Sequence, residues 1–195
     1  MSKRGWLFLG TALLFLALFG LLAWAQVKSG GNPGVLGTNS EFGEVRVEPE
    51  KAHQFTLELL DGTSLSLSDL QGEVVLVDFW ASWCTPCRQE APALAEVYRE
   101  YSGRGVEFVG VNIWDREGDA RDYMNHFNVP YPNGVDTQGT IAIDYGVRGI
   151  PEKFLINRQG VVVKKLVGPV DVESLSSILD GLLGAAVADD QENEG

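Results

Sequence analysis

The only two cysteines of this 195-residue chain, Cys84 and Cys87, lie three positions apart and follow an apolar run. Two thiols at this spacing can close into a short disulfide and open again. A helix that begins between them directs backbone N–H groups and its positive dipole end at the first sulfur, which lowers the pKa of that thiol. The pair therefore predicts a redox centre in which Cys84 is the exposed attacking thiol and Cys87, one helical turn further on, is the buried resolving thiol.

Other uses of a Cys-x-x-Cys pair fit the sequence less well. A structural zinc site needs four ligands, and the two histidines, His53 and His126, are not at helical or knuckle spacing from each other, so no metal is expected. A c-type haem site needs a histidine directly after the second cysteine, where Arg88 stands. A permanent structural disulfide remains an alternative interpretation, although a disulfide that closes so short a loop stabilises a fold least.

Two carboxylates are candidates for moving protons on and off the thiols. Asp78 interrupts the apolar run from Val74 to Trp80, which is typical of a strand buried on both faces, and burial there raises the pKa of a carboxyl group. Glu90 follows Cys87 by three positions and so shares its helix face. Each has an ordinary alternative: Asp78 as a core carboxylate bonded to a backbone group, and Glu90 as a solvated surface residue.

Two longer strings carry a resemblance to a known family. VLVDFWASWCTPC, from Val75 to Cys87, resembles the core of the thioredoxin superfamily. YGVRGIPEKFLI, from Tyr145 to Ile156, is similar to the membrane-anchored thiol reductases of the TlpA, ResA and DsbE/CcmG group, with the Pro-Glu-x-Phe order most similar to DsbE/CcmG. The resemblance covers about residues 53 to 183. It implies an α/β, thioredoxin-like fold with a mixed central sheet, helices on both faces, an added N-terminal β-hairpin, and a redox-active disulfide without another cofactor.

The resemblance also implies where a client protein would bind. Pro151 corresponds to a cis proline that faces the cysteine pair, and Ile150 before it would offer its backbone groups to an extended client segment. Trp83, together with Trp80, is expected to form an apolar rim beside the cysteines.

The residues between the cysteines belong to the expected client-binding site, and the two carboxylates have counterparts in the same group of proteins. Thr85 and Pro86 are expected to tune the reduction potential through the hydrogen bonding of the Cys84 thiolate. Asp78 matches the buried aspartate of thioredoxins. Glu90 is similar to the acidic residue that follows the motif in ResA-like and CcmG-like reductases.

The N-terminal segment is expected to hold the protein at a membrane. Residues 6–25 contain no charge over 20 positions, enough to cross a bilayer as a helix, so 1–25 is interpreted as a membrane anchor. Lys3 and Arg4 precede it, which places the rest of the chain outside the cytoplasm. Ala23-Trp24-Ala25 has the form that signal peptidase accepts, so a cleaved signal peptide remains an alternative interpretation of this segment.

The remaining chain divides into three parts. Residues 26–51 are rich in Gly, Asn, Pro and Ser and are predicted to be a flexible linker. A thioredoxin-like domain is expected over 52–184, beginning with a β-hairpin that turns at Asp61-Gly62. An acidic tail over 185–195 is expected to be disordered.

Alternating apolar patterns place the other elements of that domain. Strands are expected at 106–113, 153–156 and 161–167, and helices after Cys87, from Asp119 and from Asp171.

A net charge of −12 makes nucleic acid an unsuitable partner, because binding phosphates needs a basic face. The resemblance implies an extracytoplasmic protein disulfide reductase whose client is apocytochrome c, whose electrons come from a membrane thiol donor and whose N-terminal helix contacts the bilayer. A TlpA-like reductase for another client, for example in copper-site assembly, is the first alternative. A peroxiredoxin-type peroxidase would need a Pro-x-x-x-Thr-x-x-Cys arrangement, which this sequence lacks.

Overall fold

The computed structural model describes residues 13–21, 24 and 37–192, with side chains described as far as residue 184. The chain divides after Leu36 into two units, each described by itself. In the first unit residues 13–21 and 24 are helical. Within the described residues, no helix combines the length and the apolar composition that crossing a lipid bilayer requires. The predicted anchor over 1–25 lies largely outside the described residues.

The centre of the second unit is β5 (Val74–Trp80), whose seven residues are all buried. It pairs in parallel with β6 (Val106–Asn112) and antiparallel with β8 (Glu152–Ile156). The sheet continues with β7 (Asn133–Val135) beside β6 and with β9 (Val161–Val167) beside β8, which gives the strand order β9-β8-β5-β6-β7. The central strands and the closing β8–β9 hairpin confirm the sequence prediction.

The segment before the predicted domain is more ordered than its composition indicated. β1 (Gly43–Val45) and β2 (Glu50–Lys51) both pair antiparallel with β9. The chain also passes so close to Gly168, whose φ is +81°, that an added Cβ there would lie 1.9 Å from the Glu41 carbonyl oxygen. The prediction of a flexible linker over 26–51 is therefore corrected from Gly37 onward, because β9 supplies an edge on which this polar stretch pairs; residues 26–36 lie outside the described residues.

The predicted N-terminal hairpin is present as β3 (Thr56–Glu58) and β4 (Ser64–Ser66), which form a separate two-stranded sheet. Its turn is closed by Asp61, whose carboxylate accepts hydrogen bonds from the backbone N–H and the hydroxyl of Thr63. The hairpin lies against β7, where a Cβ on Gly134 would come within 2.2 Å of the Glu58 carbonyl oxygen.

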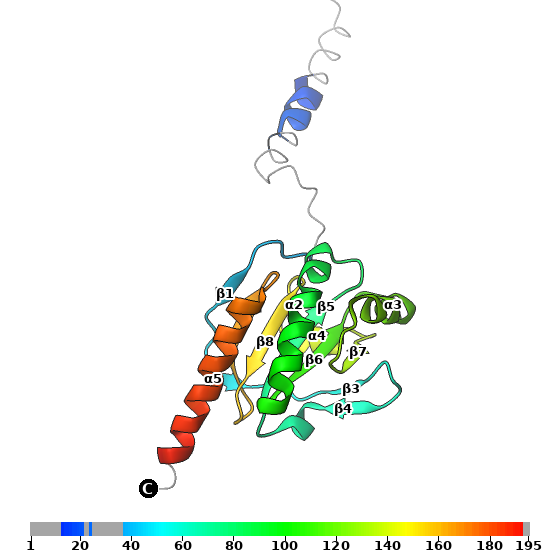
Figure 1. The fold of residues 1–195 in the computed structure, drawn as a ribbon. Helices are drawn as coiled ribbons and strands as arrows, with labels where there is room; N and C mark the ends of the chain where they lie inside the picture. Colours follow the sequence, from blue (N-terminus) through cyan, green and yellow to red (C-terminus); the bar gives the residue numbers. More distant parts are fainter. Residues whose placement is uncertain (1–12, 22–23, 25–36, 193–195) are drawn as a thin grey trace, which may run out of the picture. The chain divides into compact units, whose positions relative to one another are not determined.

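Helices cover both faces of the sheet, with α2 (Thr85–Tyr101) and α5 (Val172–Glu192) side by side on one face (Figure 1). Alternate residues of β5 face opposite sides. Leu76 packs in the buried cluster beneath α2 and α5, while Val77 and Phe79 belong to the cluster on the other face. The other two helices are α3 (Glu117–Phe127) and α4 (Thr140–Asp144).

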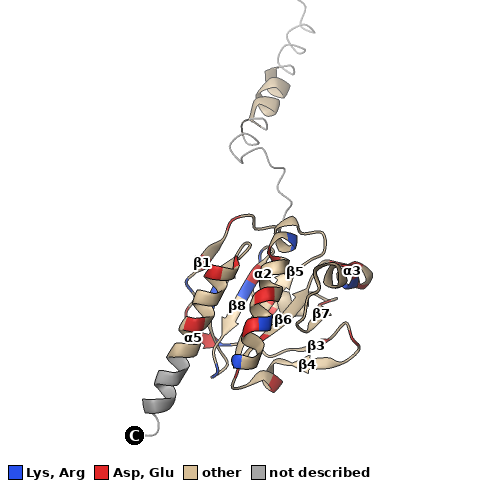
Figure 2. Ribbon diagram, in the orientation of Figure 1, with Lys and Arg blue, Asp and Glu red and all other residues tan. Residues whose placement is uncertain are grey.

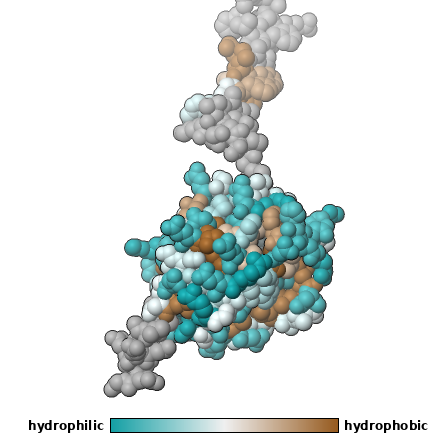
Figure 3. Space-filling model, in the orientation of Figure 1, coloured by the Kyte–Doolittle hydropathy of each residue, from teal (hydrophilic) through white to brown (hydrophobic). Residues whose placement is uncertain are grey.

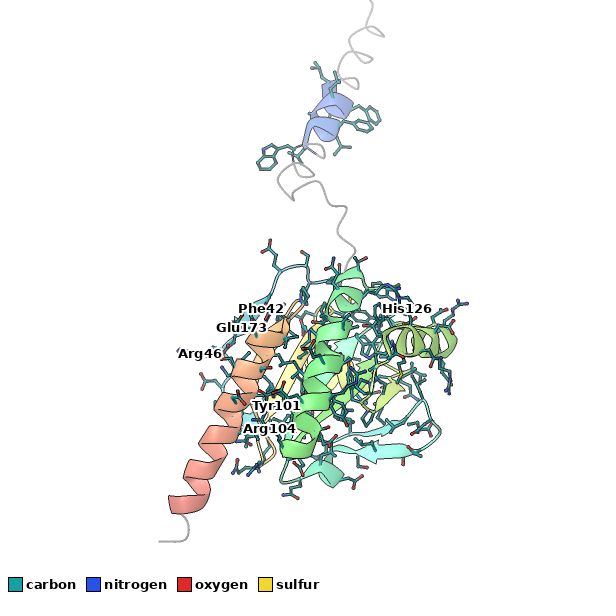
Figure 4. All side chains as sticks on the ribbon, in the orientation of Figure 1. Phe42, Arg46, Tyr101, Arg104, His126 and Glu173 are labelled. Carbon is teal, nitrogen blue, oxygen red and sulfur yellow. A yellow bond between two sulfur atoms is a disulfide. The ribbon has the colours of Figure 1, made fainter. Side chains whose placement is uncertain are left out.

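The C-terminal end of α2 is joined to α5 by polar contacts. The Tyr101 hydroxyl donates to Asp180 Oδ1 at 2.9 Å, and Arg104 forms an ion pair with the same atom (Figure 4). Asp171 caps α5 by accepting the N–H of Ser174, as predicted. The visible face of this domain is mostly hydrophilic, with hydrophobic residues in small separate patches (Figure 3).

The C-terminal end differs from its prediction. The backbone of α5 extends to Glu192, into the segment expected to be disordered over 185–195. The last three residues lie outside the described part of the chain.

Candidate active site

Cys84 and Cys87 form a disulfide at the N-terminus of α2, with 5.3 Å between their Cα atoms. Cys84 is the N-cap residue, and its sulfur accepts the N–H of Cys87 at 3.2 Å. Pro86 lies in the first helical turn, where a missing N–H costs nothing. The pair therefore stands at the positive end of the α2 dipole, as the sequence predicted.

The exposure of the first cysteine differs from the prediction. Cys84 and Cys87 both have 0% exposure, and both belong to a buried cluster that includes Ala81 and Ile150. Between them Thr85 is exposed and Pro86 is buried. The Cys84 sulfur is thus covered in this oxidised state, because parts of the chain distant in sequence pack around the motif.

The loop that joins β5 to α2 is held by Asp115. Its carboxylate accepts hydrogen bonds from the backbone N–H and the hydroxyl of Ser82, at 2.6 and 3.0 Å, and a third from Asn112 at 3.1 Å. The next residue, Trp83, donates its indole N–H to the Trp114 carbonyl oxygen at 2.9 Å. These bonds fix the approach of the chain to Cys84.

The two tryptophans that the sequence placed on one rim separate in the structure. Trp83 is 41% exposed beside the cysteines, whereas Trp80 is 2% exposed, stacks on Tyr123 and donates to Asn133. Trp80 lies in a strand buried on both faces, so it is a core residue and the rim prediction is wrong for it. The exposed partner of Trp83 is Trp114, which the sequence prediction missed.

The peptide bond between Ile150 and Pro151 is cis, which confirms the prediction for this proline. Phe79 pairs with Glu152, so Pro151 lies beside the end of β5, where the loop to Cys84 begins. The Ile150 side chain is fully buried. The cis proline and the cysteine pair therefore belong to one site.

Beneath this site three charged side chains meet in the core. Asp78 on β5 and Lys153 on β8 are directly opposed across the strands, and Lys153 donates to Glu90 on the buried face of α2. Acidic and basic residues both occur along α2 (Figure 2). Lys153 Nζ lies 2.5 Å from Glu90 Oε2 and 4.0 Å from Asp78 Oδ1. The exposed fractions are 2% for Asp78, 2% for Glu90 and 0% for Lys153, so the three form a buried cluster, hereafter the Asp78–Lys153–Glu90 cluster.

Burial raises the pKa of Asp78 to about 6 and that of Glu90 to about 8, although the positive charge of Lys153 lowers both pKa values. The charge on Asp78 raises the pKa of Glu90 further. The two carboxyl groups interact and titrate together, so between these pH values the pair holds one proton. One negative charge then remains to balance Lys153, and the cluster is neutral while it still carries a proton that it can exchange.

Each carboxyl group keeps one oxygen without a hydrogen-bond partner, Asp78 Oδ1 and Glu90 Oε1. The other oxygens are bonded: Asp78 Oδ2 accepts from the Tyr131 hydroxyl at 3.4 Å, and Glu90 Oε2 accepts the Val170 N–H at 2.8 Å. Glu90 lies one helical turn beyond Cys87 on the same face of α2. The free oxygens leave the cluster able to take up a proton below the cysteine pair.

Sequence reasoning missed Lys153 and the two tyrosines near the site. Lys153 lacked the signal that revealed Asp78, because it follows the charged Glu152 at the start of its strand and does not interrupt an apolar run. Tyr123, which donates to the Cys87 carbonyl oxygen at 2.8 Å, carried no comparable signal, nor did Tyr131. The structure brings Asp78 and Glu90 together in one cluster, while Trp83 and Thr85 lie at the exposed edge of the motif.

A family model described as AhpC/TSA family matches residues 49–165, which is more than half of the chain. The chain belongs to the AhpC/TSA family. Among its AhpC/TSA-like relatives, the thiol-disulfide oxidoreductase ResA of Bacillus subtilis is 37% identical over 121 residues, covering 62% of this chain and 68% of ResA. Together with the cysteine pair, this makes the protein a thiol-disulfide oxidoreductase. Within its described residues no group of three or more His, Cys, Asp or Glu residues that could hold a metal ion is present.

Solved structures extend the likeness of this AhpC/TSA family member. A putative thiol:disulfide interchange protein DsbE from Chlorobium tepidum aligns with a TM-score of 0.66 and 35% identity, covering 71% of this chain and 99% of that one. A secreted Mycobacterium tuberculosis disulfide oxidoreductase homologous to E. coli DsbE aligns with a TM-score of 0.59 and 27% identity, covering 68% and 96%.

Replacing Asp78 with asparagine is expected to make the protein about 2 kcal/mol more stable at pH 8. The raised pKa values mean that the native cluster holds protons that the unfolded chain has released. The free energy of unfolding of the parent therefore falls as pH rises from about 4, the carboxyl range of the unfolded chain, through the folded values of about 6 and 8. Asp78→Asn keeps the shape, removes one of the two titrations and flattens this decline. Urea denaturation between pH 4 and 9 measures the effect.

The control for this prediction is Asp122→Asn, on the exposed side of α3. Its profile should follow that of the parent. If the free energy of unfolding of Asp78→Asn fell with pH as steeply as that of the parent, the titration could not be assigned to the Asp78–Lys153–Glu90 cluster.

Proposed function

We propose that this protein is an extracytoplasmic, membrane-anchored protein disulfide reductase that keeps the haem-attachment cysteines of apocytochrome c reduced. Its electrons would come from a membrane thiol donor. The proposal is supported by the likeness to a DsbE structure and to ResA, by the Pro-Glu-x-Phe order at Pro151, and by the uncharged N-terminal segment of the sequence.

The observation that carries the direction of the reaction is the electrostatic surrounding of the cysteine pair. The Cys84 sulfur accepts one backbone N–H, and the buried charged residue next along the helix face is the acid Glu90. The Arg88 guanidinium donates to the Ser82 carbonyl oxygen and lies 5.0 Å from the Phe127 ring centroid, so its charge is engaged by these groups. On this proposal the Cys84 thiolate is stabilised by the N-terminus of α2, while the Lys153 charge is balanced by the carboxyl pair. A thiolate without a further cationic partner favours the disulfide form more than one that has such a partner, so the reduced pair gives up its electrons.

The proposed reaction uses these groups in turn. The Cys84 thiolate attacks one sulfur of the client disulfide, which forms a mixed disulfide and releases a client thiolate that takes up a proton. Cys87 gives its proton to the carboxyl pair and attacks the Cys84 sulfur, which releases the second client sulfur as a thiolate that takes up a proton from water. Two electrons pass from the enzyme dithiol to the client, and the product is the Cys84–Cys87 disulfide seen here.

The client is tested by trapping it on the enzyme. In a Cys87→Ser variant the mixed disulfide at Cys84 has no resolving thiol, so it should accumulate as a covalent adduct that a reductant releases. Purification of the full chain from cells, followed by mass spectrometry of the released proteins, should recover a c-type apocytochrome.

The matched control is the Cys84→Ser/Cys87→Ser double variant, which should recover no reductant-sensitive adduct. Adducts without any apocytochrome would contradict the proposed client and favour the alternative, a reductase for another client such as a protein of copper-site assembly. Absence of any adduct from Cys87→Ser would contradict the reductase proposal itself.

A further inference from the structure

The backbone of Ile150, beside the cysteine pair, is already occupied by another part of the chain. The Ile150 N–H donates to the Gly37 carbonyl oxygen at 2.5 Å, and the Ile150 carbonyl oxygen accepts the Asn39 N–H at 2.6 Å. Thr38, between these two residues, forms a parallel β-bridge with Ile150. Residues 37–39, hereafter the strap, thus run as a short extended segment along the residue that precedes the cis proline.

Side chains hold the strap close to the loop. The Asn39 amide group donates to the Pro151 carbonyl oxygen at 3.3 Å. A Cβ added to Gly149 would lie 3.0 Å from Asn39 Oδ1, and one added to Gly37 would lie 3.2 Å from the Trp114 ring. Glycine at both positions therefore allows the strap to lie between the cis-proline loop and an exposed tryptophan of the active-site rim.

The strap uses the backbone groups that a client would need. An extended peptide that adds to a strand pairs its main chain with the free N–H and C=O groups of that strand. At Ile150 both groups are taken by Gly37 and Asn39, and each backbone N–H pairs well with one acceptor at a time. A client segment and the strap therefore exclude each other at this position.

The attachment of the strap also allows it to dissociate from the Ile150 loop. On its C-terminal side the chain passes Gly168 and enters β1, which is anchored on β9. The strap pairs with the loop at the single residue Ile150, whereas β1 pairs with β9 over three residues. A segment that pairs at one residue can open locally without unfolding the domain.

We propose that residues 37–39 act as an intramolecular pseudo-client, which covers the docking edge at Ile150 when no client is bound and is displaced when an extended client segment pairs there. This inference rests on the proposed function only in that clients of the reductase dock beside the cis proline. It assigns to the start of the second unit a regulatory role in client access.

The test compares two substitutions at Asn39 in the full chain, each combined with Cys87→Ser so that Cys84 is the only thiol. Asn39→Pro removes the main-chain N–H that bonds to Ile150, whereas Asn39→Ala keeps it and loses the side-chain contact with Pro151. The probe is a synthetic peptide with a Cys-x-x-Cys disulfide, and the measurement is the rate at which it forms a mixed disulfide with Cys84. Losing one hydrogen bond should raise this rate about threefold to tenfold for Asn39→Pro and less for Asn39→Ala.

Iodoacetamide, which reacts with the thiol without docking as a strand, serves as the reference reagent. Its rate should change much less than the peptide rate. An unchanged peptide rate in Asn39→Pro overturns the proposal, and so does an equal rise with both reagents, because that reports general loosening of the site.

Hydrogen exchange gives a second test that needs no substitution in the strap. In Cys87→Ser, a peptide activated as its 2-thiopyridyl disulfide is attached to Cys84, and exchange is compared with the unattached protein. The Asn39 N–H should exchange at least tenfold faster in the adduct, while the Ile150 N–H stays protected by the peptide. Continued protection of Asn39 in the adduct overturns the proposal.

The failure of this inference can be told apart from failure of the proposed function. Attachment through the activated peptide does not depend on the protein being a reductase, so exchange at Asn39 reports on the strap alone. If the full chain fails to reduce protein disulfides while the Asn39 N–H exchanges faster in the adduct, the proposed function is wrong and the proposed role of the strap is supported.

Discussion

Replacing Lys153 with methionine is expected to lower the free energy of unfolding by about 3 to 5 kcal/mol at pH 8. Lys153 is fully buried between Asp78 and Glu90, and these carboxyl groups face it from β5 and α2. Methionine fills much of the same volume but leaves two buried carboxyl groups without a cation. Their pKa values should rise further, so the loss should be large at pH 8 and much smaller at pH 5, where both groups are protonated in the folded protein.

Urea denaturation at the two pH values measures this difference. Lys164→Met is the matched control, because Lys164 lies on the neighbouring strand β9 with its side chain 32% exposed and pairs with Glu44. It should cost at most about 1 kcal/mol at either pH. Equal losses at pH 5 and pH 8 for Lys153→Met would contradict the role of Lys153 as the counter-ion of the carboxyl pair.

Replacing Cys84 with serine is expected to abolish disulfide reduction, with a loss of about 1000-fold or more, because a serine hydroxyl does not replace a thiolate as the attacking group. Cys84 is the N-cap of α2, and its sulfur already accepts an N–H from the helix. Cys87 lies inside the first helical turn and is not the N-cap residue. The measurement is the single-turnover reaction of the reduced protein with a fluorescently labelled disulfide peptide.

Cys87→Ser is the matched control in this assay. It should still attack the peptide once and stop at the mixed disulfide. If Cys87→Ser lost the first attack and Cys84→Ser kept it, the assignment of the attacking and resolving thiols would be reversed.

Local pattern was sufficient to predict most of the fold. β5, the helix after Cys84 and the hairpin at Asp61-Gly62 each have a signal within a few neighbouring residues, such as an unbroken apolar run or a turn dipeptide. β1 and β2 have no such signal. They form because β9, more than 100 positions away in the chain, provides an edge for them, and composition alone indicated a linker.

The site was predictable to a similar extent. Asp78 and Glu90 were identified from their residue types, but their meeting through Lys153 depends on the register of β5 with β8 and on which face of α2 is buried. The burial of Cys84 and the position of Trp80 likewise depend on packing between distant segments. Spacing along the chain identifies which groups can react, and tertiary structure decides which of them meet.

The outer strands of the sheet are short, which bears on the solubility of the protein. At one edge β1 and β2 have three and two residues. At the other edge β7 has three residues, and the hairpin meets it on its outer side through the bridge of Leu59 with Gly134. A long unpaired edge would allow other chains to pair with it, which leads to aggregation. With both edges this short, the proposed pairing of a client at Ile150, once the strap is displaced, would be the main route by which a client strand adds to the domain, and that route would bring the client to the cysteines.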